Sequence, residues 1–181
     1  GQMLSTRPDL VGVEIAEELE SLRDNTPTTP FSEMKKVIET ELQRPIYEVF
    51  SEIEETPIGS ASIGQVYRAK LKGSNEEVAV KVQKPNSHEI IETDVKIMKF
   101  LADNIDKYLL QMKSFNLPAM ASEFERSIFK ELNYMEEVMN MENLSKNFKN
   151  ISYIKIPKAY TDYCTNKLIT MELIDGIEVS Q

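Results

Sequence analysis

The stretch from Ile58 to Pro85 constrains the fold of this chain more than any other. It begins with a turn of small residues, GSASIG, and continues into a strand-like segment, a tight turn around Gly73 and a second strand that carries Lys81. Small residues allow a backbone to approach a ligand closely, and a lysine beside them adds a positive charge. The stretch therefore predicts an anion site, for which a nucleotide phosphate is the best candidate.

Both strand-like segments, VYRAKL at 66–71 and VAVKV at 78–82, alternate in a way that is typical of half-buried strands. In the second segment the three valines share one face, so Lys81 shares the opposite face with Ala79. Because Ala79 is small, that face leaves room for a ligand.

The first 50 residues are expected to form a helical extension. Apolar residues recur at helical spacing between Val11 and Leu22, and again after Ser32, which is a good N-cap for a helix that ends before Pro45. Fifty residues of this kind are too few for an independent core. We expect the extension, 1–50, to precede a domain at 51–181.

The sequence after Pro85 predicts two helices followed by two strands. The helices are expected at about 87–112 and 118–148, and the strands at 153–160 and 167–174. Taken in order, these elements predict an α+β fold with an antiparallel sheet of about five strands.

Charge and composition exclude several classes of function. A net charge of −9 and a pI near 4.8 argue against a nucleic-acid partner. One cysteine, Cys164, and one histidine, His88, exclude an intrachain disulfide and a Cys/His metal cluster. There is no apolar run of membrane-spanning length and no secretory signal pattern, so the cytoplasm is the expected compartment, with membrane association only through segments outside these residues.

Lys81 has two interpretations from the residues alone. A lysine on a strand is most often solvated, but this one lies between valines, and a buried ammonium group needs a carboxylate partner. The helix expected at 118–148 supplies Glu131, Glu136 and Glu137. On a regular helix Glu137 shares a face with two asparagines and Glu131 points nearly the opposite way, so we favour Glu137 as the partner. In the alternative, these acids form a solvated stripe and GSASIG is an ordinary turn.

The order of parts resembles the N-terminal lobe of a protein kinase: a phosphate-covering loop, a strand lysine, a helix glutamate and a hinge. The segment MELIDG at 171–176 resembles the kinase hinge. This resemblance implies that the carbonyl of Glu172 and the N–H of Ile174 hold the adenine edge. It also implies that Met171 takes the gatekeeper position.

A closer resemblance covers nearly the whole chain. Four blocks occur in the right order, STRPDL, SASIGQVYRA, VAVKVQKP and ELNYMEEVMN, and together they resemble the UbiB/AarF/ADCK family of atypical kinase-like proteins. This implies that Lys81 and Glu137 are the catalytic ion pair. The family's Lys-x-Gly-Gln motif would end at Gln2, and its Glu-x-Asp motif would be Glu131 and Asn133. The implied nucleotide contacts are Gly59, Ser60, Ala61, Ser62, Gly64, Gln65 and Lys81.

Two positions depart from the family pattern. Position 133 is Asn rather than Asp, which removes a charge from the Glu-x-Asp motif. The loop reads Gly-Ser-Ala where the family often has Ala-Ala-Ala, so Gly59 restores the residue of ordinary kinases. The choice between ATP and ADP stays open on these residues.

The resemblance implies an ATP-binding ATPase or phosphotransferase linked to isoprenoid lipid or ubiquinone metabolism. A lipid or membrane surface would be a partner through the full-length protein; no oligomeric state is indicated. Because the chain starts without Met at Gly1 and stops at Gln181, we expect it to be a fragment. The catalytic loop and the Mg²⁺ ligands would lie in an absent C-terminal lobe. The fragment alone is therefore expected to be inactive and to hold no metal ligands.

Two alternatives remain. In the first, the parent protein is a nucleotide-sensing scaffold without phosphoryl transfer, and Asn133 marks the lost chemistry. In the second, the chain is a plain α+β domain with a solvated Lys81. The sequence that follows Gln181 would separate the first of these from the enzyme.

Overall fold

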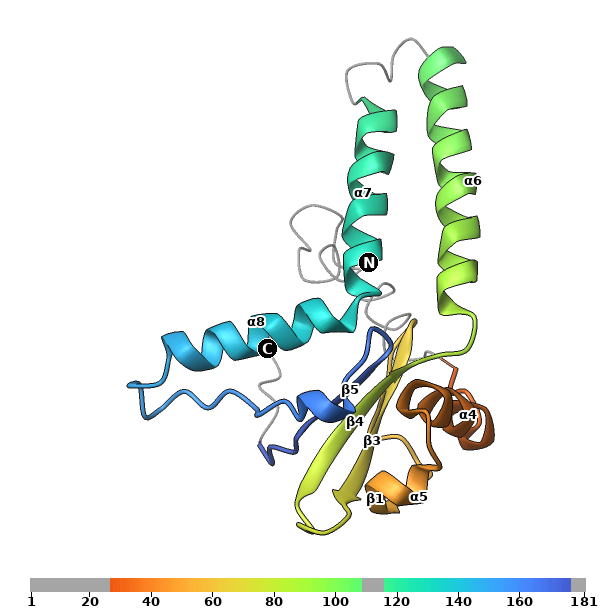
Figure 1. Ribbon diagram of the computed structural model, residues 1–181. Helices are drawn as coiled ribbons and strands as arrows, with labels where there is room; N and C mark the ends of the chain where they lie inside the picture. The colour runs from red at the N-terminus through yellow and green to blue at the C-terminus, as the bar shows by residue number, and fades with distance from the viewer. Residues whose placement is uncertain (1–26, 109–115, 177–181) are drawn as a thin grey trace. The chain divides into compact units, whose positions relative to one another are not determined.

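A computed structural model describes residues 27–108 and 116–176 of the chain (Figure 1). The helix predicted at 11–22 and the motif residue Gln2 lie outside the described residues. The chain divides into two compact units, 1–84 and 85–181.

In the described part of the first unit, from residue 27 on, two helices are followed by four strands. They are α4 (Phe31–Leu42), α5 (Ile46–Val49), β1 (Phe50–Ile53), β2 (Gly59–Ser60), β3 (Gly64–Leu71) and β4 (Glu77–Gln83). All the pairings among these strands are antiparallel: β3 pairs with β1, β2 and β4. Helix α4 contacts β4 and α5 contacts β1, so both helices belong to the packed unit that carries the sheet. The division expected at residue 50 stays a prediction.

The alternation predicted for β3 and β4 is confirmed. Tyr67 is completely buried on β3, and the three valines of β4 are buried on one face while Lys81 on the other face is half-buried. The intervening turn uses Gly73 at φ 96° and Asn75 at φ 60°. These are backbone conformations that glycine and asparagine adopt most readily, which explains why the strands reverse here.

The expected N-cap of α4 is wrong by two residues. The helix begins at Phe31, so Ser32 lies inside its first turn and Pro30 is the N-cap. The Pro30 carbonyl accepts the first backbone hydrogen bonds of the helix, from the N–H groups of Glu33 and Met34, and Pro30 supplies no side-chain cap. The helix ends at Leu42 with Gln43 in the left-handed conformation, before Pro45 as expected.

Within 85–108 and 116–176, the second unit shows three long helices, a short 3₁₀ helix and one strand. They are α6 (Ser87–Tyr108), α7 (Leu117–Glu131), α8 (Tyr134–Asn147), η2 (Thr161–Tyr163) and β5 (Leu168–Glu172). The single helix predicted at 118–148 is wrong, because the chain breaks it at Leu132 and Asn133. Asn133 leaves the helical conformation at φ −102° and ψ 89°, and its side chain accepts a hydrogen bond from Met135 N. A helix start therefore replaces a helix interior at this point.

The strand predicted at 153–160 is also wrong. This segment runs beside β5 and makes an isolated bridge between Ala159 and Met171, without a continuous ladder. Pro157 lies within it and has no N–H to donate, which interrupts a regular strand. The strand predicted at 167–174 is confirmed with shorter bounds as β5.

A small core joins α8 to β5. Tyr134 and Val138 of α8 pack with Ile169 of β5, and Met171 packs against this cluster. The helices and antiparallel strands of the two units confirm the predicted α+β class. None of the helices in the described ranges combines the length and apolar character needed to cross a bilayer.

Candidate functional site

The small-residue turn forms a short connection between β2 and β3. The N–H of Ala61 donates to the carbonyl of Gly64 at 2.8 Å, which leaves Ser62 and Ile63 at the tip. The Lys84 N–H donates to the Ile63 carbonyl at 2.9 Å and holds the tip against the end of β4. Ala61 and Ser62 are exposed, so the outer side of the turn is open to a ligand.

The loop has both space and an unused polar group. A Cβ added at Gly59 would meet no atom within 4 Å, and Gly59 does not have a positive φ. The packing of the described residues therefore does not require glycine here, which leaves close approach of a ligand as the reason for a small residue. The Ser60 hydroxyl is buried and has no hydrogen-bond partner among the described residues. These two features fit a bound phosphate chain.

Gln65, predicted as a nucleotide contact, uses its side chain elsewhere. It is completely buried, and its amide oxygen accepts from the N–H of Thr29 while its amide nitrogen donates to the Thr29 carbonyl at 3.2 Å. The same nitrogen lies 2.6 Å from the Tyr67 hydroxyl. The side chain thus ties the connector before α4 to β3. Any contact of Gln65 with a nucleotide stays a prediction for its backbone.

Lys81 lies on the same strand pair as the loop. The turn leads directly into β3 through Gly64, and Lys81 on β4 stands opposite Val66 in the antiparallel register. Its half-buried side chain shares a face with Ala79, as the sequence predicts. The structure therefore brings the phosphate-binding candidates of the first unit together on two adjacent strands.

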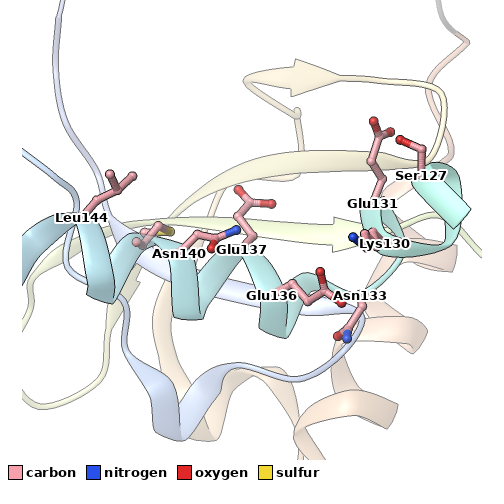
Figure 2. Close-up of a pocket in the computed structure, with 9 residues that line it drawn as sticks. Ser127, Lys130, Glu131, Asn133, Glu136, Glu137, Asn140 and Leu144 are labelled. Carbon is pink, nitrogen blue, oxygen red and sulfur yellow. The ribbon is translucent and has the colours of Figure 1, made fainter.

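The second unit has an acidic pocket where α7 meets α8 (Figure 2). Its volume is about 680 Å³. The lining residues come from the end of α7 and the first turns of α8: Ser127, Lys130, Glu131, Asn133, Glu136, Glu137, Asn140, Met141 and Leu144. In the part of the chain that the structure describes, Glu131 has no salt-bridge partner.

The break between the helices corrects one prediction about this pocket. On one continuous helix, Glu131 would point away from Glu137. Because the chain turns at Leu132 and Asn133, both carboxylates line the same cavity, and Figure 2 shows them projecting toward the same side. The Glu-x-Asp motif positions and the candidate partner of Lys81 are therefore neighbours.

Asn133 has a structural role that the sequence analysis missed. Its Oδ1 accepts the Met135 N–H at 3.3 Å, so it caps α8. The signal was present in the sequence, since Asn133 is followed three residues later by Glu136, the spacing of a capping box. Asn and Asp cap helices about equally well, so the replacement of the family Asp preserves this function and removes only the charge.

The predicted adenine edge lies at the end of β5. Glu172 N donates to the Lys158 carbonyl at 2.8 Å, and the Glu172 carboxylate lies 2.6 Å from Lys155 Nζ. This hydrogen bond from Lys155 is the main reason that the pKa of Glu172 lies below its ordinary value. Ile174 follows the strand and is exposed, while Met171 packs on the α8 core.

No group of three or more His, Cys, Asp or Glu side chains is placed to hold a metal ion within residues 27–108 and 116–176.

Comparison with known proteins decides the family. The family model of the ABC1 atypical kinase-like domain matches residues 21–181 of the sequence. The chain belongs to the ABC1 atypical kinase-like family. This confirms the UbiB/AarF/ADCK resemblance drawn from the sequence motifs.

Similar proteins of the ABC1 family come from bacteria and plants. A probable protein kinase UbiB of Tolumonas auensis is 37% identical over 180 residues, which is 99% of this chain and 33% of that protein. The chloroplastic protein ACTIVITY OF BC1 COMPLEX KINASE 1 of Arabidopsis thaliana is 38% identical over 98% of this chain and 26% of that protein. The present chain thus spans between about a quarter and a third of the length of these relatives.

A solved structure shares the fold of this chain. Rv3197 of Mycobacterium tuberculosis, determined in complex with erythromycin, superposes with a TM-score of 0.64 and 28% identity. The match covers 98% of this chain and 44% of that one. It supports the kinase-like α+β class read from the elements.

Proposed function

We propose that this chain is the nucleotide-binding N-terminal lobe of a UbiB-type ATP-dependent protein. The observation that carries the proposal is the shared β3–β4 strand pair. It holds the small-residue loop, with its open Gly59 and a buried Ser60 hydroxyl that has no partner among the described residues, and it holds Lys81 on the same face as the small Ala79. Membership of an atypical kinase-like family supports a nucleotide as the anion.

In this proposal the loop from Gly59 to Gly64 covers the phosphates, and Lys81 neutralises their charge while paired with Glu137. The carbonyl of Glu172 and the N–H of Ile174 hold the adenine edge, with Met171 behind it. Hydrogen bonds to charged groups are the stronger class, so Lys81 supplies much of the phosphate affinity. Mg²⁺, held by ligands outside these residues, would supply charge neutralisation of the transferred phosphate.

The names of the relatives support the biological role that we propose. The UbiB name of several relatives supports a link to ubiquinone or another isoprenoid lipid, with a lipid or membrane surface as a partner of the full-length protein. The reaction of that protein would be ATP hydrolysis or phosphoryl transfer.

The second candidate is a nucleotide-sensing scaffold that binds ATP without turning it over. The missing charge at Asn133 favours it, but the capping role of this side chain gives Asn a reason to be there that is independent of catalysis. We therefore keep the enzyme as the leading proposal.

The test uses the full-length protein and measures nucleotide-dependent thermal stabilisation together with ATP turnover. Lys81→Ala and Glu137→Gln are expected to weaken ATP binding by about tenfold or more, the size of a lost charged hydrogen bond. Lys36→Ala, at an exposed site on α4, is the matched control. Unchanged nucleotide affinity in Lys81→Ala would refute the assigned role of Lys81. Binding without turnover by the unmodified protein would favour the scaffold.

A further inference from the structure

Helices α6 and α7 lie side by side (Figure 1). Their side chains line an apolar groove. The groove has a volume of about 500 Å³. Nine of its ten lining residues are apolar, and the tenth is Asp94. The ion pair between Lys99 of α6 and Glu125 of α7, at 2.8 Å, joins the two helices.

The walls of this groove are exposed to an unusual degree for apolar side chains. Ile97 and Leu101 of α6 and Met120 and Phe124 of α7 each have more than half of their surface accessible, between 51% and 59%. A contiguous apolar patch that stays open to water is unfavourable, and such patches mark interaction sites. The geometry, two parallel ridges of apolar residues along paired helices, is that of a groove that accepts another helix.

Charge decides what kind of helix fits. Helices α6 and α7 together carry eight acidic and five basic residues, a net charge of −3. Asp94 is exposed at the groove and has no salt-bridge partner in the described part of the chain. A partner with basic residues beside its apolar face would be attracted to this surface, and an acidic partner would be repelled.

Three other occupants carry the wrong charge. A second copy of the chain would bring the same net negative hairpin. An anionic bilayer would meet Asp94 and the net negative charge of the two helices. The amphipathic segment predicted at 11–22 of this chain has four glutamates and no basic residue. Each of these would place like charges opposite one another.

We propose that the groove between α6 and α7 binds an amphipathic helix of a partner protein. The apolar face of that helix fills the groove, and a basic residue at its edge pairs with Asp94. None of the groove residues is assigned to nucleotide binding, so the proposal does not depend on the proposed function.

The test measures the binding of a fluorescein-labelled peptide to the full-length protein by fluorescence anisotropy. The peptide consists of Leu and Lys arranged so that the leucines form one helical face. One control peptide has the same residues in an order that spreads the leucines around the helix, and a second has Glu in place of Lys. We expect the first peptide to bind and both controls to bind at least about tenfold more weakly.

Matched variants locate the binding site. Leu101→Ser and Met120→Ser, one on each wall, should weaken binding by about tenfold, and Asp94→Asn by about threefold. Phe100→Ser is the apolar control, because Phe100 is 67% exposed on the same helix and does not line the groove. Asp103→Asn is the charge control, because it removes the same charge from α6 outside the groove. Neither control should change the affinity.

Several results would overturn the proposal. They are equal binding of the two Leu/Lys peptides, or an equal loss of affinity in Phe100→Ser and Leu101→Ser. Binding of the protein to vesicles of phosphatidylcholine and phosphatidylglycerol that Leu101→Ser abolishes would assign the groove to a membrane. A dimer that Leu101→Ser dissociates would assign it to a second copy. A tenfold gain in peptide affinity on deletion of residues 1–22 would assign it to the chain's own N-terminal segment.

Discussion

The side-chain amide of Gln65 pairs with the backbone of Thr29 through both of its polar atoms, although the two residues are 36 positions apart. The N–H of Thr29 donates to Oε1, and Nε2 donates to the Thr29 carbonyl. Gln65 directly follows Gly64, the residue that closes the phosphate-loop candidate. The connector before α4 is therefore fastened beside that loop, and Lys84 Nζ adds a second tie to the Pro27 carbonyl at 2.9 Å.

Replacing Gln65 with Met should destabilise the protein by about 2 kcal/mol. The thioether keeps the length and packing of the side chain but leaves the Thr29 backbone and the Tyr67 hydroxyl without a buried partner. Tyr67→Phe removes one of these hydrogen bonds and should cost about 1 kcal/mol. Urea unfolding of the full-length variants measures both. If Gln65→Met cost no more than Tyr67→Phe, the pairing with Thr29 would contribute nothing.

Gly59→Ala should leave the stability unchanged and alter the response to nucleotide. An added Cβ meets no atom of the chain within 4 Å. It would, however, occupy space that a phosphate chain needs. The matched control is Gly73→Ala, which also adds a Cβ in open space but at φ +96°, and should cost about 1–2 kcal/mol. Thermal melts with and without ATP separate the two effects, and a destabilised Gly59→Ala protein without ATP would contradict the open geometry of the loop.

Asn133→Ala should cost about 1 kcal/mol through loss of the α8 cap, whereas Asn133→Asp should retain the stability. The aspartate also restores the charge that the family motif carries. Asn140→Ala, in the same pocket but inside the helix, is the control for general effects on the pocket. Chemical unfolding measures the stability, and ATP affinity measured on Asn133→Asp reports the charge separately. Equal losses in the Ala and Asp variants would show that the side-chain oxygen does not cap the helix.

The Lys155–Glu172 contact makes part of the stability depend on pH. The hydrogen bond from Lys155 is the largest cause of the lowered pKa of Glu172. A carboxyl group with a lowered folded pKa stabilises the fold above its unfolded pKa, and this stabilisation is lost as the pH falls through the folded pKa. Glu172→Gln should therefore be less stable than the unmodified protein by about 0.5 kcal/mol at neutral pH, and the difference should vanish in acid.

The comparison uses thermal melts over a range of pH, with Glu142→Gln, at an exposed site on α8, as the control. A difference between Glu172→Gln and the unmodified protein that stays constant into acid would assign the effect to the shape of the side chain rather than to its charge.

The strands around Lys81 were predictable because their signals are local. Alternation of apolar and polar residues fixes which face is buried, and Gly73 and Asn75 supply the left-handed conformations of the turn. The face of Lys81 follows from its position beside Val80 and Val82. No long-range information is needed for any of these.

The break between α7 and α8 was harder to predict because the apolar spacing continues across it. Leu132, Met135 and Val138 keep the period of a helix, while the cap signal rests on Asn133 and Glu136 alone. Hydrophobic period indicates that a segment is helical but does not locate helix ends. The hydrogen bond from Tyr134 N to the Asn166 carbonyl, at 3.0 Å, is a tertiary contact that helps hold the break and has no local signature.

The partnership between Gln65 and Thr29 could not be read from the sequence for a similar reason. A glutamine after a small-residue loop is equally suited to a ligand or to a backbone. The choice depends on where the connector passes, and the packing of α4 against β4 determines that path.

A shared hydrophobic core packs α8 against β5. Tyr134 and Val138 of the helix interlock with Ile169 of the strand, and Met171 extends the contact toward the strand end. The helix that bears Glu137 and the strand that leads to Ile174 therefore share one set of buried contacts. If Glu137 pairs with Lys81 and Ile174 holds the base, as we propose, a shift of α8 would change both contacts together.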